Sequence, residues 1–201
     1  MTRTMLSIIV VPLLVVVSDV KVAAATLMTQ AYYNDVVTST RTLSHSTIGV
    51  KSRFKAQRIP QIVDTSVTLS GLPDVSALTY RRRQNMTEGD LLQTHWVNML
   101  LYQNAMQLVV TDEQNYLGSQ SFLSDFQNIG GTLSSTASKI STIIYLRNTT
   151  GTCITSSNGT LVFASDANEV ERNERDYLVL YAIASYLPDT LADFTRLKNS
   201  L

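Results

Sequence analysis

Cysteine and histidine are scarce in this sequence of 201 residues. Cys153 is the only cysteine, so no disulfide can form within the chain. It lies in a segment rich in glycine, serine and threonine, where a free thiol and a bridge to another chain both stay open. The only histidines, His45 and His95, have no metal-ligand partner at a useful spacing. The position of His95 beside Trp96 indicates a residue at the core boundary. We therefore expect no metal site.

Local signatures of catalysis are also missing. There is no glycine-rich phosphate loop, no Gly-x-Ser-x-Gly elbow and no Cys/His pair with a recognisable spacing. The acidic pair Glu169 and Glu171 lies close to Arg172 and Arg175, a pattern typical of a solvated helix face. The sequence thus predicts a protein that is not an enzyme and needs no cofactor.

The charge balance gives no reason to expect a polyanionic partner. Sixteen basic and sixteen acidic residues cancel, and nucleic-acid-binding domains are usually strongly basic. One local exception is the run Arg81-Arg82-Arg83. We interpret it as a solvated charge run, with a processing site as the alternative. No nucleic-acid partner is expected.

Residues 1–25 have the pattern of a secretory signal peptide. A basic start precedes an apolar run, Met5–Val17, and small residues follow near two candidate cleavage points, after Ser18 or after Ala25. The run is short for a membrane span; an uncleaved anchor or a buried strand is the alternative. We expect residues 26–201 to form one secreted, extracellular domain without stable membrane insertion.

Three N-glycosylation sequons agree with a secretory route. They begin at Asn85, Asn148 and Asn158, each in a segment predicted to be a loop or a helix edge. A glycan at such a position would be solvated. The sequence therefore predicts a glycoprotein, with the occupancy of each sequon left open.

Four long segments carry apolar residues at helical spacing, so the fold class is expected to be all-α. The first spans about residues 27–54. The second begins at the predicted N-cap Thr87, with Asp90 as the reciprocal capping residue. The third begins near Ser119, and the fourth covers the C-terminal part of the chain. The predicted core stripes are Tyr33, Val36, Val37, Thr40, Leu43, Ile48 and Phe54; Leu92, Trp96, Met99, Met106 and Val109; Phe122, Phe126, Ile129, Leu133, Ala137, Ile140 and Ile144; and Tyr177, Leu180, Ala184, Leu187, Leu191 and Phe194.

The connections between these segments predict the topology. Residues 56–86 and 147–168 are long and aperiodic, whereas residues 112–116 form a short polar link after a helix predicted to end near Thr111. Two long connections with a short one between them are typical of a long-chain four-helix bundle with up-up-down-down topology and two crossovers. The helical spacing of the last stripe continues unchanged across Pro188. This continuity favours one kinked helix over a helix that stops and restarts.

The C-terminal stretch DYLVLYAIASYLPDTLADFTRLK, from Asp176 to Lys198, carries a resemblance to a known family. An Asp-aromatic start, a mid-helix aromatic at Tyr186 and an Asp-Phe-x-Arg-Leu ending resemble the last helix of interleukin-6-type cytokines, in the branch of cardiotrophin-like cytokine and ciliary neurotrophic factor. Thr87-Glu88 with Leu92-Gln93 and Asp125-Phe126 are similar to the second and third helices of that branch. The resemblance covers roughly residues 71–201.

This resemblance implies receptor-binding regions. They comprise the end of the last helix with the first crossover, the outer faces of the first and third helices, and the start of the last helix. Asp193, Arg196 and Lys198 would then face a receptor. The branch carries Phe-x-x-Lys at the start of its last helix, where this chain has Val170 and Asn173. Buried aromatic anchors supply much of an interface's energy, so exposed residues at these positions would leave a receptor pocket unfilled.

The sequence as a whole predicts a secreted helical cytokine, or neurotrophic-type growth factor, that assembles cell-surface receptors and triggers receptor-associated kinase signalling. The implied partners are the shared interleukin-6-type signalling receptor and, as a further candidate, an alpha receptor of the ciliary neurotrophic factor type. The alternative is a secreted helical carrier of a lipid or small apolar ligand. A carrier should contain a large apolar cavity, whereas a cytokine should have a filled core.

Overall fold

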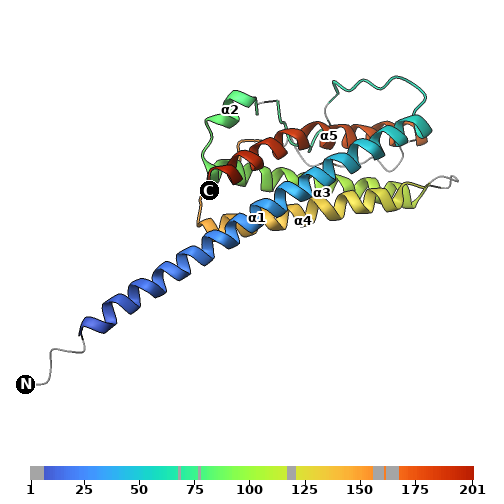
Figure 1. Ribbon diagram of the computed structural model, residues 1–201. Coiled ribbons are helices and arrows are strands. Elements are labelled where there is room, and N and C mark those ends of the chain that lie inside the picture. Colours follow the sequence, from blue (N-terminus) through green and yellow to red (C-terminus); the bar gives the residue numbers. More distant parts are fainter. Residues whose placement is uncertain (1–6, 68, 77, 117–120, 156–160, 162–167) are drawn as a thin grey trace, which may run out of the picture.

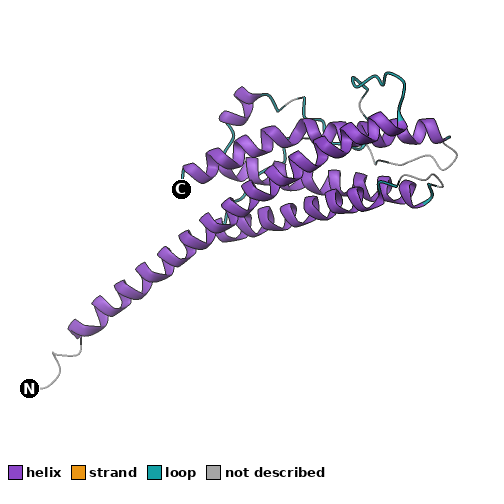
Figure 2. Cartoon of the chain, turned by 45° about the vertical axis from the view of Figure 1, so that its right-hand side comes forward, coloured by secondary structure: helices purple, strands orange, loops and turns teal. Residues whose placement is uncertain are grey.

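The computed structural model contains five α-helices, and the residues that it describes include no β-strand (Figures 1 and 2). It describes residues 7–67, 69–76, 78–116, 121–155, 161 and 168–201, with side chains from residue 26 onward. The helices are α1 (Ser7–Arg58), α2 (Tyr80–Gln84), α3 (Glu88–Gln114), α4 (Leu123–Arg147) and α5 (Glu169–Asn199). The prediction of an all-α chain is confirmed.

Helix α1 is longer than predicted. It begins at Ser7, within the segment interpreted as a signal peptide, and its first part projects beyond the other helices (Figure 1). Cleavage of that segment stays a prediction. The buried face of α1 includes Leu43, Thr47 and Val50, whereas Ile48 is 43% exposed. Assigning Ile48 to the core was wrong, because the helical phase places the polar Thr47 inward and its larger neighbour outward.

Helices α3 and α4 form a closely packed pair. The Thr87 side chain caps α3 by accepting from the Asp90 N–H at 3.1 Å, as predicted. Along α3, Trp96 is only partly buried. Near the end of α4, Ile143 is fully buried, whereas the predicted core residue Ile144 is only partly buried. A Cβ atom on Gly130 would lie 3.6 Å from the Met106 Cβ, an ordinary van der Waals contact, so alanine would also fit where these two helices pack.

The ends of α3 and α4 differ from the prediction. Helix α3 continues to Gln114 instead of ending near Thr111. Helix α4 begins at Leu123, and the predicted start at Ser119 lies outside the described residues. Glu113 explains this junction, because its Oε1 accepts from Arg58 at 2.9 Å and from the backbone N–H of Phe122 at 2.7 Å. One buried carboxylate thereby joins the end of α3 to the start of α4.

Helix α5 runs through Pro188 as one helix, so the stop-and-restart alternative is wrong. Asn168 and Glu171 form a reciprocal capping box at its start. Pro188 itself is exposed, and Ala184 and Leu187 are buried on either side of its turn. The proline leaves the carbonyl of Ala184, four residues earlier, without its helical N–H donor.

The four long helices lie side by side around one core (Figure 1). Helix α1 packs against α4 and α5, and α3 packs against the same two helices. The largest fully buried side chains include Tyr33, Tyr102, Phe54, Phe126 and Phe194. The short helix α2 lies in the connection between α1 and α3, and this connection contributes Ile59, Leu72 and Leu78 to the buried set.

Candidate functional site

Arg83 of α2 is the residue that attaches the first crossover to the last helix. Its side chain is 4% exposed, and its two terminal nitrogens donate to the carboxylate of Asp189 at 2.8 and 2.6 Å. Its Nε lies 3.0 Å from Asp193 Oδ2, an ion-pair contact without hydrogen-bond geometry. A further hydrogen bond reaches the Leu78 carbonyl oxygen. Interpreting all three arginines as solvated was therefore wrong for Arg83.

The carboxylate of Asp193 also faces His95. His95 Nε2 lies 3.2 Å from Asp193 Oδ2, and His95 Nδ1 lies 2.5 Å from the Tyr186 hydroxyl. All three side chains are buried, with exposed fractions of 1% for His95 and Asp193 and 3% for Tyr186. The assignment of His95 to the core boundary was wrong, and so was the exposure expected of Asp193. Both residues lie on buried helix faces, one turn from Leu92 and Leu197 respectively.

The same polar network reaches the second crossover. Asn98 donates to the Tyr186 hydroxyl at 3.3 Å and accepts from the Thr155 hydroxyl at 2.5 Å. The Thr94 hydroxyl accepts from the backbone N–H of Ile154 at 3.2 Å. Burial raises the pKa of the Tyr186 phenol far above its usual value, so the hydroxyl stays protonated. A histidine, an aspartate and a tyrosine shielded from solvent in this way bind the two crossovers to α3 and α5.

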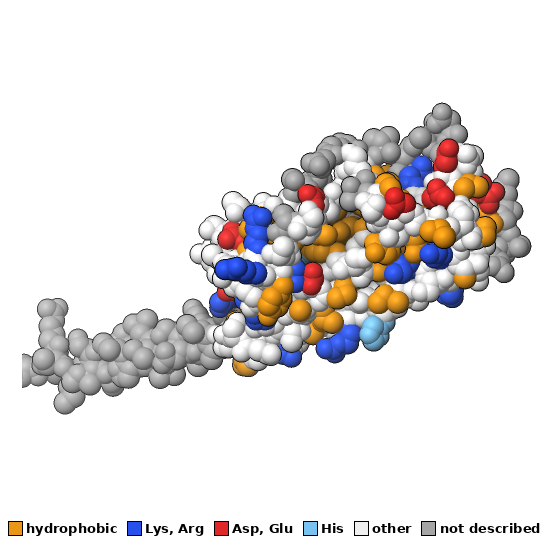
Figure 3. Space-filling view, turned by 90° about the horizontal axis from the view of Figure 1, so that it is seen from above, with side chains coloured by type: hydrophobic (Ala, Val, Ile, Leu, Met, Phe, Trp, Pro, Cys, Tyr) orange, Lys and Arg blue, Asp and Glu red, His pale blue; other side chains and the backbone are white. Residues whose placement is uncertain are grey.

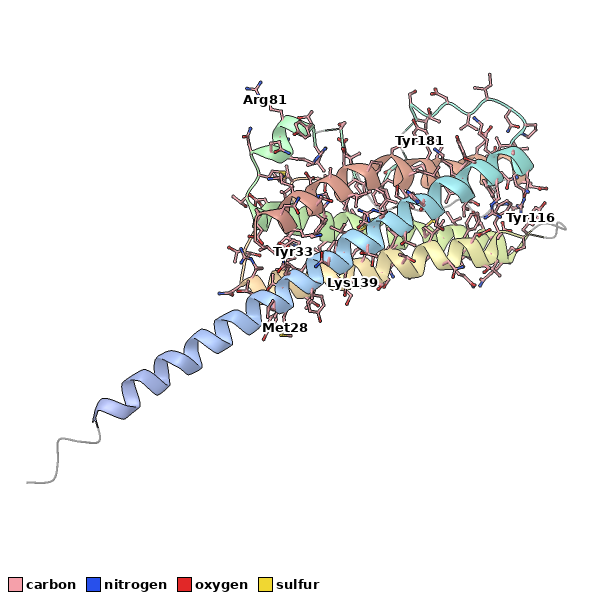
Figure 4. All side chains as sticks on the ribbon, viewed as in Figure 1. Met28, Tyr33, Arg81, Tyr116, Lys139 and Tyr181 are labelled. Atoms are coloured by element: carbon pink, nitrogen blue, oxygen red, sulfur yellow. The ribbon has the colours of Figure 1, made fainter. Side chains whose placement is uncertain are left out.

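An exposed surface covers this buried network. Arg196, on α5, donates to the backbone carbonyl of Arg83 at 3.2 Å, and Lys198 lies in the last turn of the same helix. On α2, Tyr80 is 68% exposed, and Arg81 and Arg82 are exposed too. Arg81 points away from the helices in Figure 4, and basic side chains gather at this end of the molecule in Figure 3. We call residues 80–82, 196 and 198 the α2–α5 surface.

The start of α5 agrees only in part with expectation. Val170 is 54% exposed, as predicted, but Asn173 is 8% exposed, and its predicted exposure was wrong. Asn173 lies one turn before Tyr177, on the face of α5 that packs inward. Of the residues that the resemblance implies for receptor binding, Val170, Arg196 and Lys198 are therefore accessible, and Asn173 and Asp193 are buried.

Asp176 is an unusual buried carboxyl at the start of α5. It is 3% exposed, and no described group makes a hydrogen bond to its Oδ1. Its neighbours around a space of about 10 Å³, roughly room for one water molecule, include Arg58, Glu113 and Arg172. Burial, followed by the nearby Asp112 carboxylate, raises the pKa of Asp176 well above its usual range. Asp176 is therefore protonated in the folded protein at a pH where an exposed aspartate is ionised.

We expect Asp176→Asn to change the pH dependence of stability. The wild-type folded state retains a proton that the unfolded chain loses near pH 4, so its stability falls by about 1.4 kcal/mol per pH unit above that point. This fall ends once the folded-state pKa is passed. The asparagine amide does not titrate, so the variant lacks this pH-dependent loss of stability. The variant should therefore gain stability relative to the wild type as the pH rises. Urea unfolding of both proteins from about pH 4 to about pH 7 measures the difference. Parallel profiles would contradict the assignment.

The predicted modification sites are placed as follows. Asn85 and Asn148 are exposed, and Asn148 adopts a left-handed conformation at the end of α4, with φ of 46°. Asn158 lies outside the described residues. The thiol of Cys153 is partly buried and lies 3.3 Å from the Thr155 carbonyl oxygen. The cysteine is free in this chain, and glycosylation stays a prediction.

Comparisons with known proteins assign no family to this arrangement. No protein-family model matches the chain, and no curated protein sequence matches it. Among the residues whose side chains the structure describes, no helix is both long and apolar enough to cross a membrane, and no cluster of three metal-ligating side chains occurs.

Proposed function

We propose that the four long helices form a long-chain bundle with up-up-down-down topology. Arg58 and Glu113, 2.9 Å apart, are at the carboxyl ends of α1 and α3, which supports a parallel pair. Arg53, near the end of α1, pairs at 2.9 Å with Asp125 in the first turn of α4, which supports antiparallel neighbours. The colour order in Figure 1 agrees with these directions. Two long crossovers, 59–87 and 148–168, then join parallel helices.

Within this architecture, the chain acts as a secreted helical cytokine of the neurotrophic growth-factor type. It binds cell-surface receptor chains, brings them together and triggers receptor-associated kinase signalling. One observation carries this proposal: Arg83 holds α2 against Asp189 and Asp193 of α5. The first crossover and the end of the last helix thereby share one surface, and the sequence resemblance implies receptor binding by these two segments together.

The proposed contact residues follow from accessibility. Arg196 and Lys198 contact the receptor from the α2–α5 surface, and Val170 contacts it at the start of α5. Asn173 and Asp193 are buried and stabilise the packing of α5. The proposed partners are the shared interleukin-6-type signalling receptor and an alpha receptor of the ciliary neurotrophic factor type. Asn85 and Asn148 are exposed acceptors for glycans during secretion.

The packing of the core favours this proposal over a carrier. A carrier of a lipid or small apolar ligand would hold it between the helices. That space is filled by aromatic pairs with 0% exposure: the rings of Tyr33 and Phe194 lie 6.1 Å apart, and those of Phe54 and Phe126 lie 5.5 Å apart. Aromatic side chains at native packing density leave no room for a ligand among them.

Receptor binding by the secreted full-length chain tests the proposal. We expect the wild type to bind at least one of the two receptor types and to activate the associated kinase in cells that express them. Neutralising two charges of the α2–α5 surface, those of the exposed Arg81 and the partly exposed Lys198, in Arg81→Gln with Lys198→Gln, should weaken binding by about tenfold, because charged rim residues guide association. Surface plasmon resonance and kinase phosphorylation are the measurements.

Asn104→Asp with Gln107→Glu is the matched control. Both residues are exposed on α3, and this variant changes the net charge by the same amount. It should bind as the wild type does. Equal weakening in both variants would mean that net charge alone governs binding, and absence of binding by the wild type to either receptor type would refute the proposal.

A further inference from the structure

A second hollow lies between the first crossover and the outer side of α5, away from the buried polar network. Its volume is about 680 Å³, within the range of about 300–1,000 Å³ typical of small-molecule sites. The crossover forms one wall with residues 65–76, and α5 forms the other with Leu178, Tyr181 and Ala182. Tyr181 lies between α5 and the crossover in Figure 4, and Figure 3 shows exposed hydrophobic side chains in a depression on this face.

The lining of this crossover cavity is mainly apolar. Leu69, Leu72 and Val75 come from the crossover, and Tyr102 reaches the cavity from α3. Tyr102 and Leu72 are buried, so they form its inner part. Hydroxyl groups accompany this apolar surface, from Thr65, Ser70, Ser76 and Ser185, for example. An apolar interior with a few neutral polar groups is the usual composition of a ligand pocket.

The charges around the cavity restrict what can occupy it. No Lys, Arg or His occurs among the described residues that line it. The one carboxylate among these described residues, Asp74, accepts from the Ser76 backbone N–H at 3.0 Å and from the Ser76 hydroxyl at 2.6 Å, and it is exposed to water. Lys51 Nζ lies 5.2 Å from the centroid of the Tyr181 ring, but no described lining residue supplies a cation, so a charged ligand of either sign would lose hydration without a charged partner in the lining.

We propose that the crossover cavity binds one uncharged small molecule with an apolar body and one or two polar groups. The apolar body fills the space between Leu72, Tyr102 and Tyr181, and the polar groups meet the hydroxyls. Because the two walls belong to the crossover and to α5, the bound molecule adds a link between these segments to those made by Arg83 and by Gln61, which donates to Glu174 at 2.9 Å. This activity goes beyond receptor binding, and its test uses no receptor.

Two fluorescent probes of nearly identical shape test the proposal on the full-length chain. N-phenyl-1-naphthylamine is uncharged, and 8-anilino-1-naphthalenesulfonate adds one sulfonate to the same skeleton. The uncharged probe should bind with a fluorescence increase, at least about tenfold more tightly than the sulfonate. Ser185→Phe, which places an aromatic ring at an exposed lining position, should weaken binding of the uncharged probe by about tenfold or more.

Ala192→Phe is the matched control, since Ala192 is exposed on the same helix and does not line the cavity. It should bind the uncharged probe as the wild type does, with thermal unfolding confirming that both variants fold. Ala182→Phe is a second blocking variant and should reproduce the loss seen with Ser185→Phe. No binding by the wild type, equal affinity for the two probes, or equal loss in the blocking and control variants would overturn the proposal.

Discussion

Replacing Arg83 with methionine should lower the free energy of unfolding by about 3–5 kcal/mol, because it leaves a buried carboxylate without its closest arginine. Asp193 is 1% exposed, and its remaining partners are His95, which is itself 1% exposed, and Arg196, whose Nη2 lies 3.9 Å from Asp193 Oδ1. Methionine retains much of the volume of the arginine stem, so the loss measures the charge interaction more than a cavity. Urea unfolding monitored by circular dichroism gives the value.

Two further variants separate the buried ion pair from general effects of charge. Arg81→Met removes an exposed arginine of the same short helix and should change stability by no more than about 0.5 kcal/mol. Arg83→Met combined with Asp193→Asn should recover at least about 1 kcal/mol of the loss, because the uncompensated charge disappears. A loss below about 1 kcal/mol for Arg83→Met would show that α2 adds little to global stability.

Asp193 also shows how structure and function depend on each other here. Its sequence position suggested a receptor contact, but its carboxylate is held by Arg83 and His95 inside the protein. In the proposed receptor binding, the residue therefore positions other groups: it contacts Arg83, whose carbonyl accepts from Arg196, and its own Oδ1 lies 3.9 Å from Arg196 Nη2. Receptor binding by Arg83 variants should accordingly be compared only at a temperature where they are folded.

The apolar periodicity of the sequence predicted the helices well, for a physical reason. Burial of one face is what stabilises a helix in a folded protein, so the stripes that include Leu133 and Leu187 report the packing directly. The N-cap at Thr87 was predictable too, since a cap depends on residues within one turn. Errors at the ends of helices, such as α3, arose where a distant residue sets the boundary.

Buried polar residues were the part that periodicity could not assign. His95 and Asp193 lie at stripe positions, yet a polar residue is placed inward only if a partner is present, and their partners come from other helices. Asn173 and Asp176 were missed in the same way. Their helical phase with Tyr177 and Leu180 was a usable signal, because residues three or four apart share a face. The crossover cavity depends on a non-helical segment, for which the sequence has no comparable periodicity.

Replacing Phe126 with alanine should also cost about 3–5 kcal/mol, through loss of buried apolar contacts. Phe126 has 0% exposure, and its ring lies 5.5 Å from that of Phe54 and 5.8 Å from that of Phe122. These rings join the end of α1 to the start of α4, so the variant leaves a cavity at the contact between two helices. Alanine cannot fill this space, and the surrounding helices can close it only in part.

Two comparisons make the Phe126 prediction specific. Phe126→Leu keeps most of the volume and should lose less than about 1.5 kcal/mol, whereas Trp96→Ala should lose clearly less than Phe126→Ala, because Trp96 is only partly buried. Urea unfolding of the three variants under one condition gives the ranking. If Trp96→Ala proved the most destabilising of the three, the burial of these two aromatic residues would have to be reassigned. If Phe126→Ala cost less than about 1 kcal/mol, the aromatic cluster would contribute little to holding α1 against α4.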